Sequence, residues 1–139
     1  MKKFILSILT ALLIFIFGIA DSSAQSRKSE QTKAWKQFQT AIAKSDKTAV
    51  AAMIEKFPFE GSIIGEKLNF TVASKADFIK NYARIFTPAR RKKIARGKYT
   101  PIDGEDEFNF EMDETGGYQV FRFRKIGGAY YLVGTIAVG

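Results

Sequence analysis

The sequence contains no cysteine and no histidine among its 139 residues. Without cysteine the chain forms no disulfide, offers no thiolate to a metal, and cannot carry lipid on a processed N-terminal cysteine. Stability must therefore come from side-chain packing. The sequence also lacks a glycine-rich phosphate loop, a nucleophile elbow and an acidic metal cluster; the segment Asp103–Glu107 is acidic but lacks the ligand spacing of a calcium-binding loop. We therefore expect no cofactor and no metal.

Residues 1–24 have the three parts of an export signal. Two lysines precede an uncharged run of 17 residues, Phe4–Ala20, and small residues follow up to Ala24. This pattern predicts a signal peptide cleaved between Ala24 and Gln25, with a second, less favoured cleavage point after Ala20. The uncharged run is just long enough to span a bilayer, so an uncleaved membrane anchor is the alternative. Either outcome places the rest of the chain outside the cytoplasm, and the sequence favours a periplasmic or secreted protein.

Most of the positive charge of the mature chain lies in one segment, Thr87–Lys98. Removal of residues 1–24 takes two lysines and one aspartate from the 22 cations and 14 anions, which leaves 20 and 13 and a net charge of +7. The basic segment holds six of these cations, so the rest of the mature chain, with 14 cations and 13 anions, is nearly neutral. The candidate residues for binding an anion or a partner are Arg90, Arg91, Lys92, Lys93, Arg96 and Lys98.

The mature chain is expected to consist of a short polar segment and one domain. Residues 25–33 are polar and are expected to be flexible, and residues 34–139 are expected to form a single domain without internal repeats. From Trp35 to Ile42 apolar residues recur at helical spacing, and the same spacing runs from Ala49 to Phe57. Pro58 is expected to end the second helix because proline cannot donate a helical hydrogen bond.

Two further helices are predicted by their first residues. Ser74 and Asp77 have the spacing of a capping box, so Asp77 is read as part of a helix cap and not as a catalytic base. Thr87 is placed to cap another helix, Pro88–Arg96, because proline suits the first helical position. Before them, alternation of apolar and polar residues in Leu68–Val72 predicts a short strand.

The last third of the chain predicts an antiparallel meander. The pair Gly127–Gly128 suits a two-residue turn, since glycine readily adopts the positive φ angles that such a turn needs. This turn places Phe123 opposite Leu132 and Phe121 opposite Gly134.

The preceding hairpin is expected to close through the loop Asp113–Gly116, which places Phe108 opposite Phe121 and Glu107 opposite Arg122. One face of the meander is then apolar and consists of Phe108, Phe110, Met112, Phe121, Phe123, Tyr130, Leu132, Ile136 and Val138. The other face consists of Glu105, Glu107, Asn109, Arg122, Arg124, Tyr131, Val133 and Thr135. Its charged residues are read as cross-strand pairs on a solvated surface. An apolar sheet face against amphipathic helices predicts an α+β domain.

The order of these elements resembles the nuclear transport factor 2-like superfamily, which includes steroid-isomerase-like and polyketide-cyclase-like domains. The likeness covers nearly all of Lys33–Val138 and is carried by the segments WKQFQTAIAKSDKTAVAAMIEKFPF, SKADFIKNYARIF and YQVFRFRKIGGAYYLVGTIAV. The resemblance implies a cone-shaped, cystatin-like fold, a pocket between the curved antiparallel sheet and the helices, and homodimers through the outer sheet face. It implies either an enzyme or a binding module. This chain departs from the enzymes because it has no histidine and no acid/base pair that can be placed deep in the cone.

Five aromatic residues are the candidate lining of such a pocket: Trp35, Phe38, Tyr82, Phe86 and Tyr130. Their spacing is equally that of ordinary core residues. If a pocket exists, the hydroxyls of Tyr82 and Tyr130 would be its polar handles, because a buried hydroxyl needs a hydrogen-bond partner.

Four partners are considered for the basic segment. Nucleic acid is disfavoured because an exported chain rarely meets it. Anionic lipid head groups or envelope polymers are the second, and an acidic protein is the third. We favour the fourth, in which the acidic segment Asp103–Glu107 folds against the basic segment and neutralises it.

The sequence as a whole favours an exported, non-enzymatic binding domain that takes a small ligand or a partner protein. The alternatives are a small cone-fold enzyme, either an isomerase or a hydrolase, and a protein that binds the anionic envelope through Arg90–Lys98.

Overall fold

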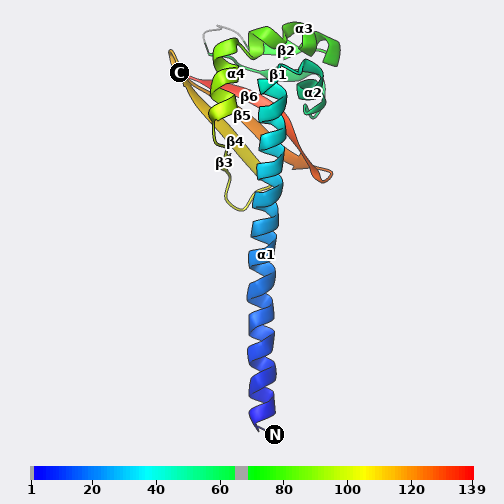
Figure 1. Cartoon of the computed structure of the whole chain (residues 1–139), viewed down its shortest axis with the longest axis vertical. Coiled ribbons are helices and arrows are strands. Elements are labelled where there is room, and N and C mark those ends of the chain that lie inside the picture. Colours follow the sequence, from blue (N-terminus) through cyan, green and yellow to red (C-terminus); the bar gives the residue numbers. More distant parts are fainter. Residues whose placement is uncertain (1, 65–68) are drawn as a thin grey trace.

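The computed structural model describes residues 2–64 and 69–139, with side chains from Ser23 onward within these ranges. A long helix crosses one face of a six-stranded sheet, and three shorter helices gather at the end of the domain farthest from the N-terminus (Figure 1). The helices are α1 (Lys2–Ala43), α2 (Lys47–Ala52), α3 (Lys75–Ile85) and α4 (Pro88–Arg96). The strands are β1 (Phe59–Gly61), β2 (Phe70–Val72), β3 (Thr100–Pro101), β4 (Glu107–Glu114), β5 (Gly117–Ile126) and β6 (Ala129–Val138). The predicted α+β class is confirmed.

Helix α1 is one continuous element from Lys2 to Ala43. Its N-terminal half projects away from the sheet, and its C-terminal half lies across it (Figure 1). The predicted cleavage point after Ala24 therefore lies inside the helix. Among the residues whose side chains the structure describes, no helix is both long and apolar enough to cross a membrane.

Residues 25–33 are helical, although the sequence predicts a flexible segment there. They contact residues near the start of β4 and the end of β5. Arg27 pairs with Asp106 at 3.1 Å, and Glu30 pairs with Lys125. These partners lie in the last third of the chain. A local sequence pattern therefore could not indicate that this part of α1 is attached to the domain.

Helices α3 and α4 begin at the predicted residues. The Ser74 hydroxyl accepts a hydrogen bond from the Asp77 backbone N–H at 3.2 Å, and the Thr87 hydroxyl accepts one from the Arg90 backbone N–H at 3.3 Å. Both contacts satisfy N–H groups that a helix start otherwise leaves without a partner. The predicted bounds of the fourth helix, Pro88–Arg96, are confirmed.

Helix α2 is shorter than predicted. It begins after Asp46, whose carboxylate caps its first turn, but it ends at Ala52 instead of Phe57. The chain then runs beside strand β6, where the Leu132 N–H donates to the Met53 carbonyl at 2.7 Å. Pairing with the sheet replaces the helical hydrogen bonds and so ends the helix.

The sheet is open and has the strand order β2-β1-β6-β5-β4-β3. It is mixed and not purely antiparallel as predicted, because β1 runs parallel to β6. Strand β2 covers Phe70–Val72, while Leu68 of the predicted strand lies outside the described residues. Strand β1 spans only Phe59–Gly61, which is too short to give a detectable alternation in the sequence.

The β5–β6 hairpin has the predicted Gly127–Gly128 turn and a bulge that the sequence did not indicate. Phe123 lies opposite Leu132, as predicted. Phe121 lies opposite Thr135, one residue farther along β6 than predicted, because the register shifts between these two pairs. Beyond the shift, each residue of β6 lies on the opposite face from the one predicted.

Because of the bulge, the residues at the end of β6 lie on the opposite faces from those predicted. Thr135, expected on the solvated face, is only 3% exposed. Ile136 and Val138, expected in the core, are 40% and 37% exposed.

The β4–β5 hairpin closes through a tighter turn than predicted. Glu114 pairs with Gly117, and Gly116 in the turn has a φ of 97°, which glycine adopts without strain. Phe108 therefore lies opposite Phe123, two residues away from the predicted partner. A shift of two residues keeps every side chain on its face, so the predicted faces of β4 and β5 are correct although the predicted pairs are wrong.

Cross-strand ion pairing on the outer face is confirmed around Glu107. Its carboxylate pairs with Arg124 and lies 3.5 Å from the guanidinium of Arg122. Glu105 lies outside the strands.

Candidate functional site

The five candidate aromatic residues come together as part of the core. Each is at most 8% exposed. Ring centres lie 5.8 Å apart for Trp35 and Phe38, 6.0 Å for Phe38 and Phe86, and 5.3 Å for Phe86 and Tyr82. Tyr130 contacts the same cluster through one further ring of β4.

Rings from the sheet pack against this cluster. Phe108 stacks on Phe123 with centres 4.7 Å apart, and Phe86 stacks on Phe121 at 5.5 Å. Of the five candidates, only Trp35 borders one of the grooves described below. The expected lining of an interior pocket thus forms aromatic packing instead.

The tyrosine hydroxyls predicted as polar handles are buried. Burial raises the pKa of Tyr82, and the nearby Arg91 only partly opposes this effect. Burial also raises the pKa of Tyr130, and the nearby amide of Gln31 has a smaller, lowering effect. The Tyr130 hydroxyl forms no well-formed hydrogen bond with the described residues. Among the described residues the Tyr82 hydroxyl has no hydrogen-bond partner, so its burial costs free energy.

Replacing Tyr82 by phenylalanine is expected to raise the free energy of unfolding by about 1 kcal/mol at pH 7, because the change removes an unpartnered buried hydroxyl and keeps the ring. The gain should grow at alkaline pH. The pKa of Tyr82 in the folded state lies above its ordinary value of 10.0. The unsubstituted chain therefore keeps its neutral-pH free energy of unfolding below pH 10, and this free energy falls as the pH rises through the folded-state pKa. Guanidinium chloride unfolding at neutral and alkaline pH measures both effects.

The matched control is Tyr118→Phe, since Tyr118 is 40% exposed. It should leave stability unchanged at both pH values. If Tyr82→Phe were instead destabilising at neutral pH, the Tyr82 hydroxyl would have to make a favourable contact, contrary to this account.

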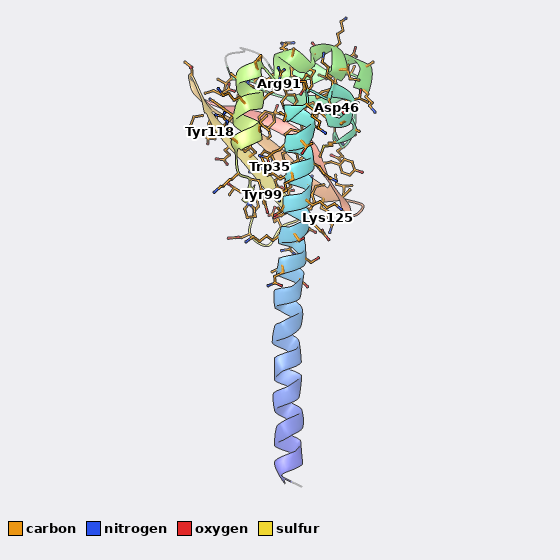
Figure 2. All side chains as sticks on the ribbon, in the orientation of Figure 1. Trp35, Asp46, Arg91, Tyr99, Tyr118 and Lys125 are labelled. Carbon is orange, nitrogen blue, oxygen red and sulfur yellow. The ribbon has the colours of Figure 1, made fainter. Side chains whose placement is uncertain are left out.

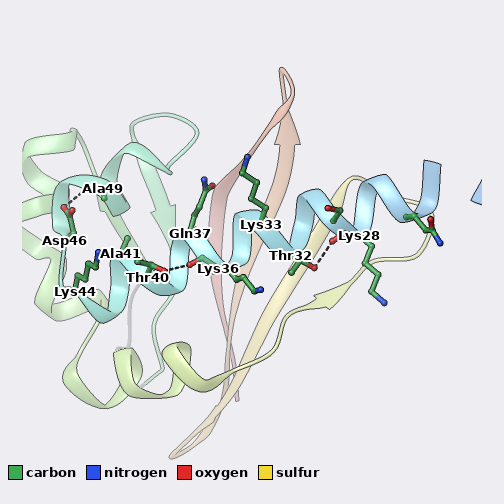
Figure 3. Close-up of a pocket in the computed structure, with 12 residues that line it drawn as sticks. Lys28, Thr32, Lys33, Lys36, Gln37, Thr40, Ala41, Lys44, Asp46 and Ala49 are labelled. Carbon is green, nitrogen blue, oxygen red and sulfur yellow. Dashed lines mark hydrogen bonds between the residues drawn. The ribbon is translucent and has the colours of Figure 1, made fainter. Parts of the chain in front are cut away.

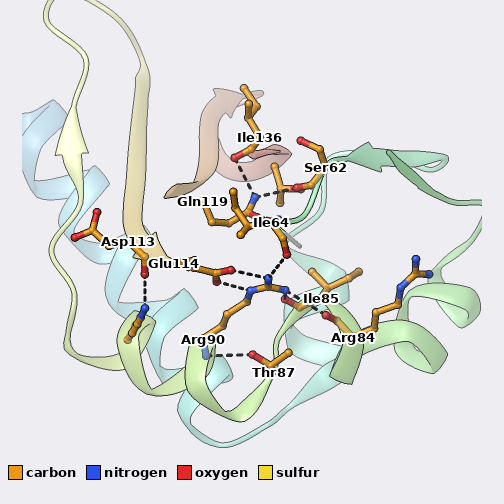
Figure 4. Close-up of polar contacts among 12 residues, drawn as sticks. Ser62, Ile64, Arg84, Ile85, Thr87, Arg90, Asp113, Glu114, Gln119 and Ile136 are labelled. Carbon is orange, nitrogen blue, oxygen red and sulfur yellow. Dashed lines mark hydrogen bonds and ion pairs between the residues drawn. The ribbon is translucent and has the colours of Figure 1, made fainter. Parts of the chain in front are cut away.

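Arg90 is not part of an anion-binding surface, and this corrects the prediction for that residue. It is 7% exposed, and its guanidinium makes two contacts with the Glu114 carboxylate, at 2.5 and 2.8 Å (Figure 4). It also donates to the backbone carbonyls of Ile64, Arg84 and Ile85 at 3.2 to 3.3 Å. Arg90 therefore joins α4 to the end of α3, the β4–β5 hairpin and the chain after β1.

The other five cations of the basic segment are more exposed and differ among themselves. Arg91 is half-buried and donates to the Phe86 carbonyl at 3.0 Å, and Lys93 donates to a backbone carbonyl of β4. Lys92, Arg96 and Lys98 are exposed and form no ion pair with the described residues. These three are the part of the predicted set that remains available to an anion.

The acidic segment Asp103–Glu107 does not neutralise the basic segment, so the favoured interpretation is wrong. Asp106 pairs with Arg27 of α1, and Glu107 pairs with the arginines of β5. Within the described part of the chain, the ion pair of the basic segment joins Arg90 to Glu114. The sequence could not show this because the pairing depends on the tight β4–β5 turn, which was predicted incorrectly.

A groove runs between α1 and the segment Gly97–Gly104, and we call it the Trp35 groove. It has a volume of about 650 Å³. Trp35 and Tyr99, labelled in Figure 2, border it together with Pro101 and Ile102. Aromatic and apolar side chains thus form part of the lining, polar and charged side chains form the rest, and the groove opens to solvent.

The two walls of the Trp35 groove are joined by hydrogen bonds. The Trp35 indole N–H donates to the Gly97 carbonyl at 3.2 Å, and the Gln39 amide donates to the same carbonyl at 2.9 Å. Farther along, the hydroxyls of Thr32 and Tyr99 are 2.9 Å apart and share a hydrogen bond. A Cβ atom at Gly97 would overlap the ring of Phe110 on β4, so glycine lets this wall lie directly against the sheet. The groove is therefore bounded by fixed elements.

Cations surround the Trp35 groove. Lys28 and Lys36 line it from α1, and Lys98 lines it from the opposite wall. Arg27 also lies at its edge but is paired with Asp106, which is not one of the lining residues. The sequence analysis missed both lysines of α1. Their four-residue steps around Thr32 would have placed them on one helix face, but the opposite wall could not be located from sequence.

A second groove, of about 840 Å³, lies along the outward face of α1 and extends to Asp46 and Ala49 (Figure 3). Most of its lining residues come from α1 itself. A single helix provides no second wall to enclose a ligand. We therefore take the Trp35 groove as the candidate site. No group of three or more carboxylates that could hold a metal ion occurs in the described ranges.

No model of a protein family matches the chain, and the comparison with curated proteins gives no match. Solved structures are similar to it at low sequence identity. An NTF2-like protein of unknown function from Shewanella oneidensis is 9% identical, with a TM-score of 0.49 over 79% of this chain and 97% of that one. An NTF2-like protein with a cystatin-like fold from Novosphingobium aromaticivorans is 13% identical, with a TM-score of 0.46 over 85% and 84% of the two chains.

A de novo designed protein with a curved β-sheet is 16% identical, with a TM-score of 0.46 over 80% of this chain and 99% of the design. The α+β assignment rests on the helices and the six-stranded sheet of the chain itself. NTF2-like proteins are thus among the structures similar to this chain.

Proposed function

We propose that the chain is an exported binding domain without enzymatic activity, and that it holds a small amphipathic molecule in the Trp35 groove. The observation that carries the proposal is the groove itself, which has both apolar and polar lining residues and two walls joined by hydrogen bonds. Its volume of about 650 Å³ lies within the range of about 300 to 1,000 Å³ that is usual for small-molecule sites. Export is supported by the leader pattern of residues 1–24.

The polar groups of the groove support ligand binding and not catalysis. The Tyr99 hydroxyl is engaged with Thr32, and the Trp35 N–H is engaged with the Gly97 carbonyl. These groups hold the walls together and are not poised to move a proton. The aromatic core gives the same indication, because the buried rings pack against one another.

Binding can be followed through Trp35, which is the only tryptophan of the sequence. An aromatic amphipathic probe, 1-anilinonaphthalene-8-sulfonate, is expected to accept energy from Trp35 when it occupies the groove. Replacing the half-buried Ile102 by aspartate should weaken this binding at least tenfold, because it places a charge among the apolar contacts.

The control variant is Ile136→Asp, which makes the same change on the outer sheet face. It should leave the affinity unchanged, since Ile136 does not line the groove. Equal affinity in both variants would contradict binding in the Trp35 groove. Fractionation of bacterial cells that express the full-length chain should recover a chain that begins at Gln25 outside the cytoplasm. An unprocessed cytosolic chain would contradict export.

A further inference from the structure

We propose that the ligand of the Trp35 groove is an amphipathic acid, with its anionic group between Lys36 and Lys98 and its apolar part against Trp35 and Ile102. This inference rests on the proposed function, because it names the chemical class of molecule that the groove takes.

The edges of the groove carry positive charge that the protein leaves uncompensated. Lys28, Lys36 and Lys98 line the groove and form no ion pair with the described residues. The acidic residue that lines it is the exposed Asp103. Like charges gathered around one groove repel each other, and a bound anion would relieve that repulsion.

The fold fixes the two walls from which Lys36 and Lys98 extend. Lys36 follows Trp35 directly on α1, while Lys98 stands between Gly97 and Tyr99 on the facing segment. Both neighbours of Lys98 are hydrogen-bonded to α1, Gly97 through its carbonyl and Tyr99 through its hydroxyl. The backbone at Lys98 is therefore held against α1, and the two lysines enter one groove from opposite sides.

The apolar lining distinguishes this groove from the other exposed cations. Lys33 lies on the outward face of α1, and Lys92 lies on α4 beside strand β4; neither lines the Trp35 groove. Simple attraction to the basic chain would engage all of these cations alike. An acid with an apolar body would engage the pair around Trp35, because burial of the apolar part adds to the charge interaction there.

The test compares two compounds of similar shape on the chain that begins at Gln25, by isothermal titration calorimetry. 2-Naphthoate carries a carboxylate, and 2-naphthylmethanol is its neutral counterpart. We expect the acid to bind at least tenfold more tightly than the alcohol. The double variant Lys36→Gln/Lys98→Gln should lose this preference, whereas Lys33→Gln/Lys92→Gln, which removes the same charge outside the groove, should keep it.

The outcomes separate the inference from the proposed function. If acid and alcohol bind equally and Ile102→Asp weakens both, the groove binds ligands but the preference for an anion is wrong. If both double variants lose the preference equally, overall charge causes it and the assignment to Lys36 and Lys98 is wrong. If neither compound binds, the inference and the proposed function both fail. The four lysines are exposed, so the variants are expected to remain folded, which circular dichroism checks.

Discussion

Replacing Arg90 by methionine is expected to lower the free energy of unfolding by about 3 to 5 kcal/mol, because it leaves one member of a buried ion pair without its partner. The Glu114 side chain is only 13% exposed and would lose both contacts to the guanidinium. Three backbone carbonyls would lose a donor as well. Urea unfolding, followed by circular dichroism, should show a clearly lower midpoint.

Two comparisons make this result specific. Lys92→Met, two residues away on the exposed side of α4, should change stability by less than about 0.5 kcal/mol. The double variant Arg90→Met/Glu114→Met should recover part of the loss, because it no longer buries an isolated charge. If Arg90→Met were as mild as Lys92→Met, Arg90 would have to be a surface residue, as the sequence first suggested.

Replacing Phe123 by alanine is expected to cost about 3 to 5 kcal/mol, because the ring is 1% exposed and its loss leaves a cavity. The ring stacks on Phe108 and meets Phe38 edge-on with centres 4.9 Å apart, so it joins α1 to the sheet. Thermal unfolding of the variant should show a large decrease in Tm, or the variant should fail to fold.

The matched variant Ile136→Ala tests the bulge. Without the register shift, Ile136 would share the core face with Phe123, and its truncation would cost about 2 to 5 kcal/mol. With the shift, Ile136 is 40% exposed, and the expected cost is about 0.5 kcal/mol or less. A core-sized loss for Ile136→Ala would show that the end of β6 faces the helices after all.

Features set by a few neighbouring residues could be predicted from the sequence. Ser74 and Thr87 cap their helices because a hydroxyl next to free N–H groups is a local contact. The Gly127–Gly128 turn is equally local, and it fixed the first pairs of its hairpin correctly. The apolar faces of β4 and β5 followed from alternation alone.

Features that depend on distant partners could not be predicted. The basic segment reads as uniform in sequence, yet its first cation, Arg90, is buried. It pairs with Glu114 because a tight turn brings that carboxylate to α4. The Trp35 groove needs α1 and Gly97–Gly104 side by side, and this contact joins residues about 60 positions apart. Of the candidate site, the sequence therefore supplied Trp35 and Lys98 but not their arrangement.

The continuity of α1 across the predicted cleavage point has a consequence for maturation. A chain that starts at Gln25 would begin with a free ammonium group at the positive end of the helix dipole, followed closely by Arg27 and Lys28, an arrangement that opposes helix formation. The tether of Arg27 to Asp106 then acts as an anchor for the new first turn. If the chain is cleaved and binds a ligand as proposed, removal of residues 1–24 would change the start of the helix that forms one wall of the Trp35 groove, and processing would then alter ligand affinity.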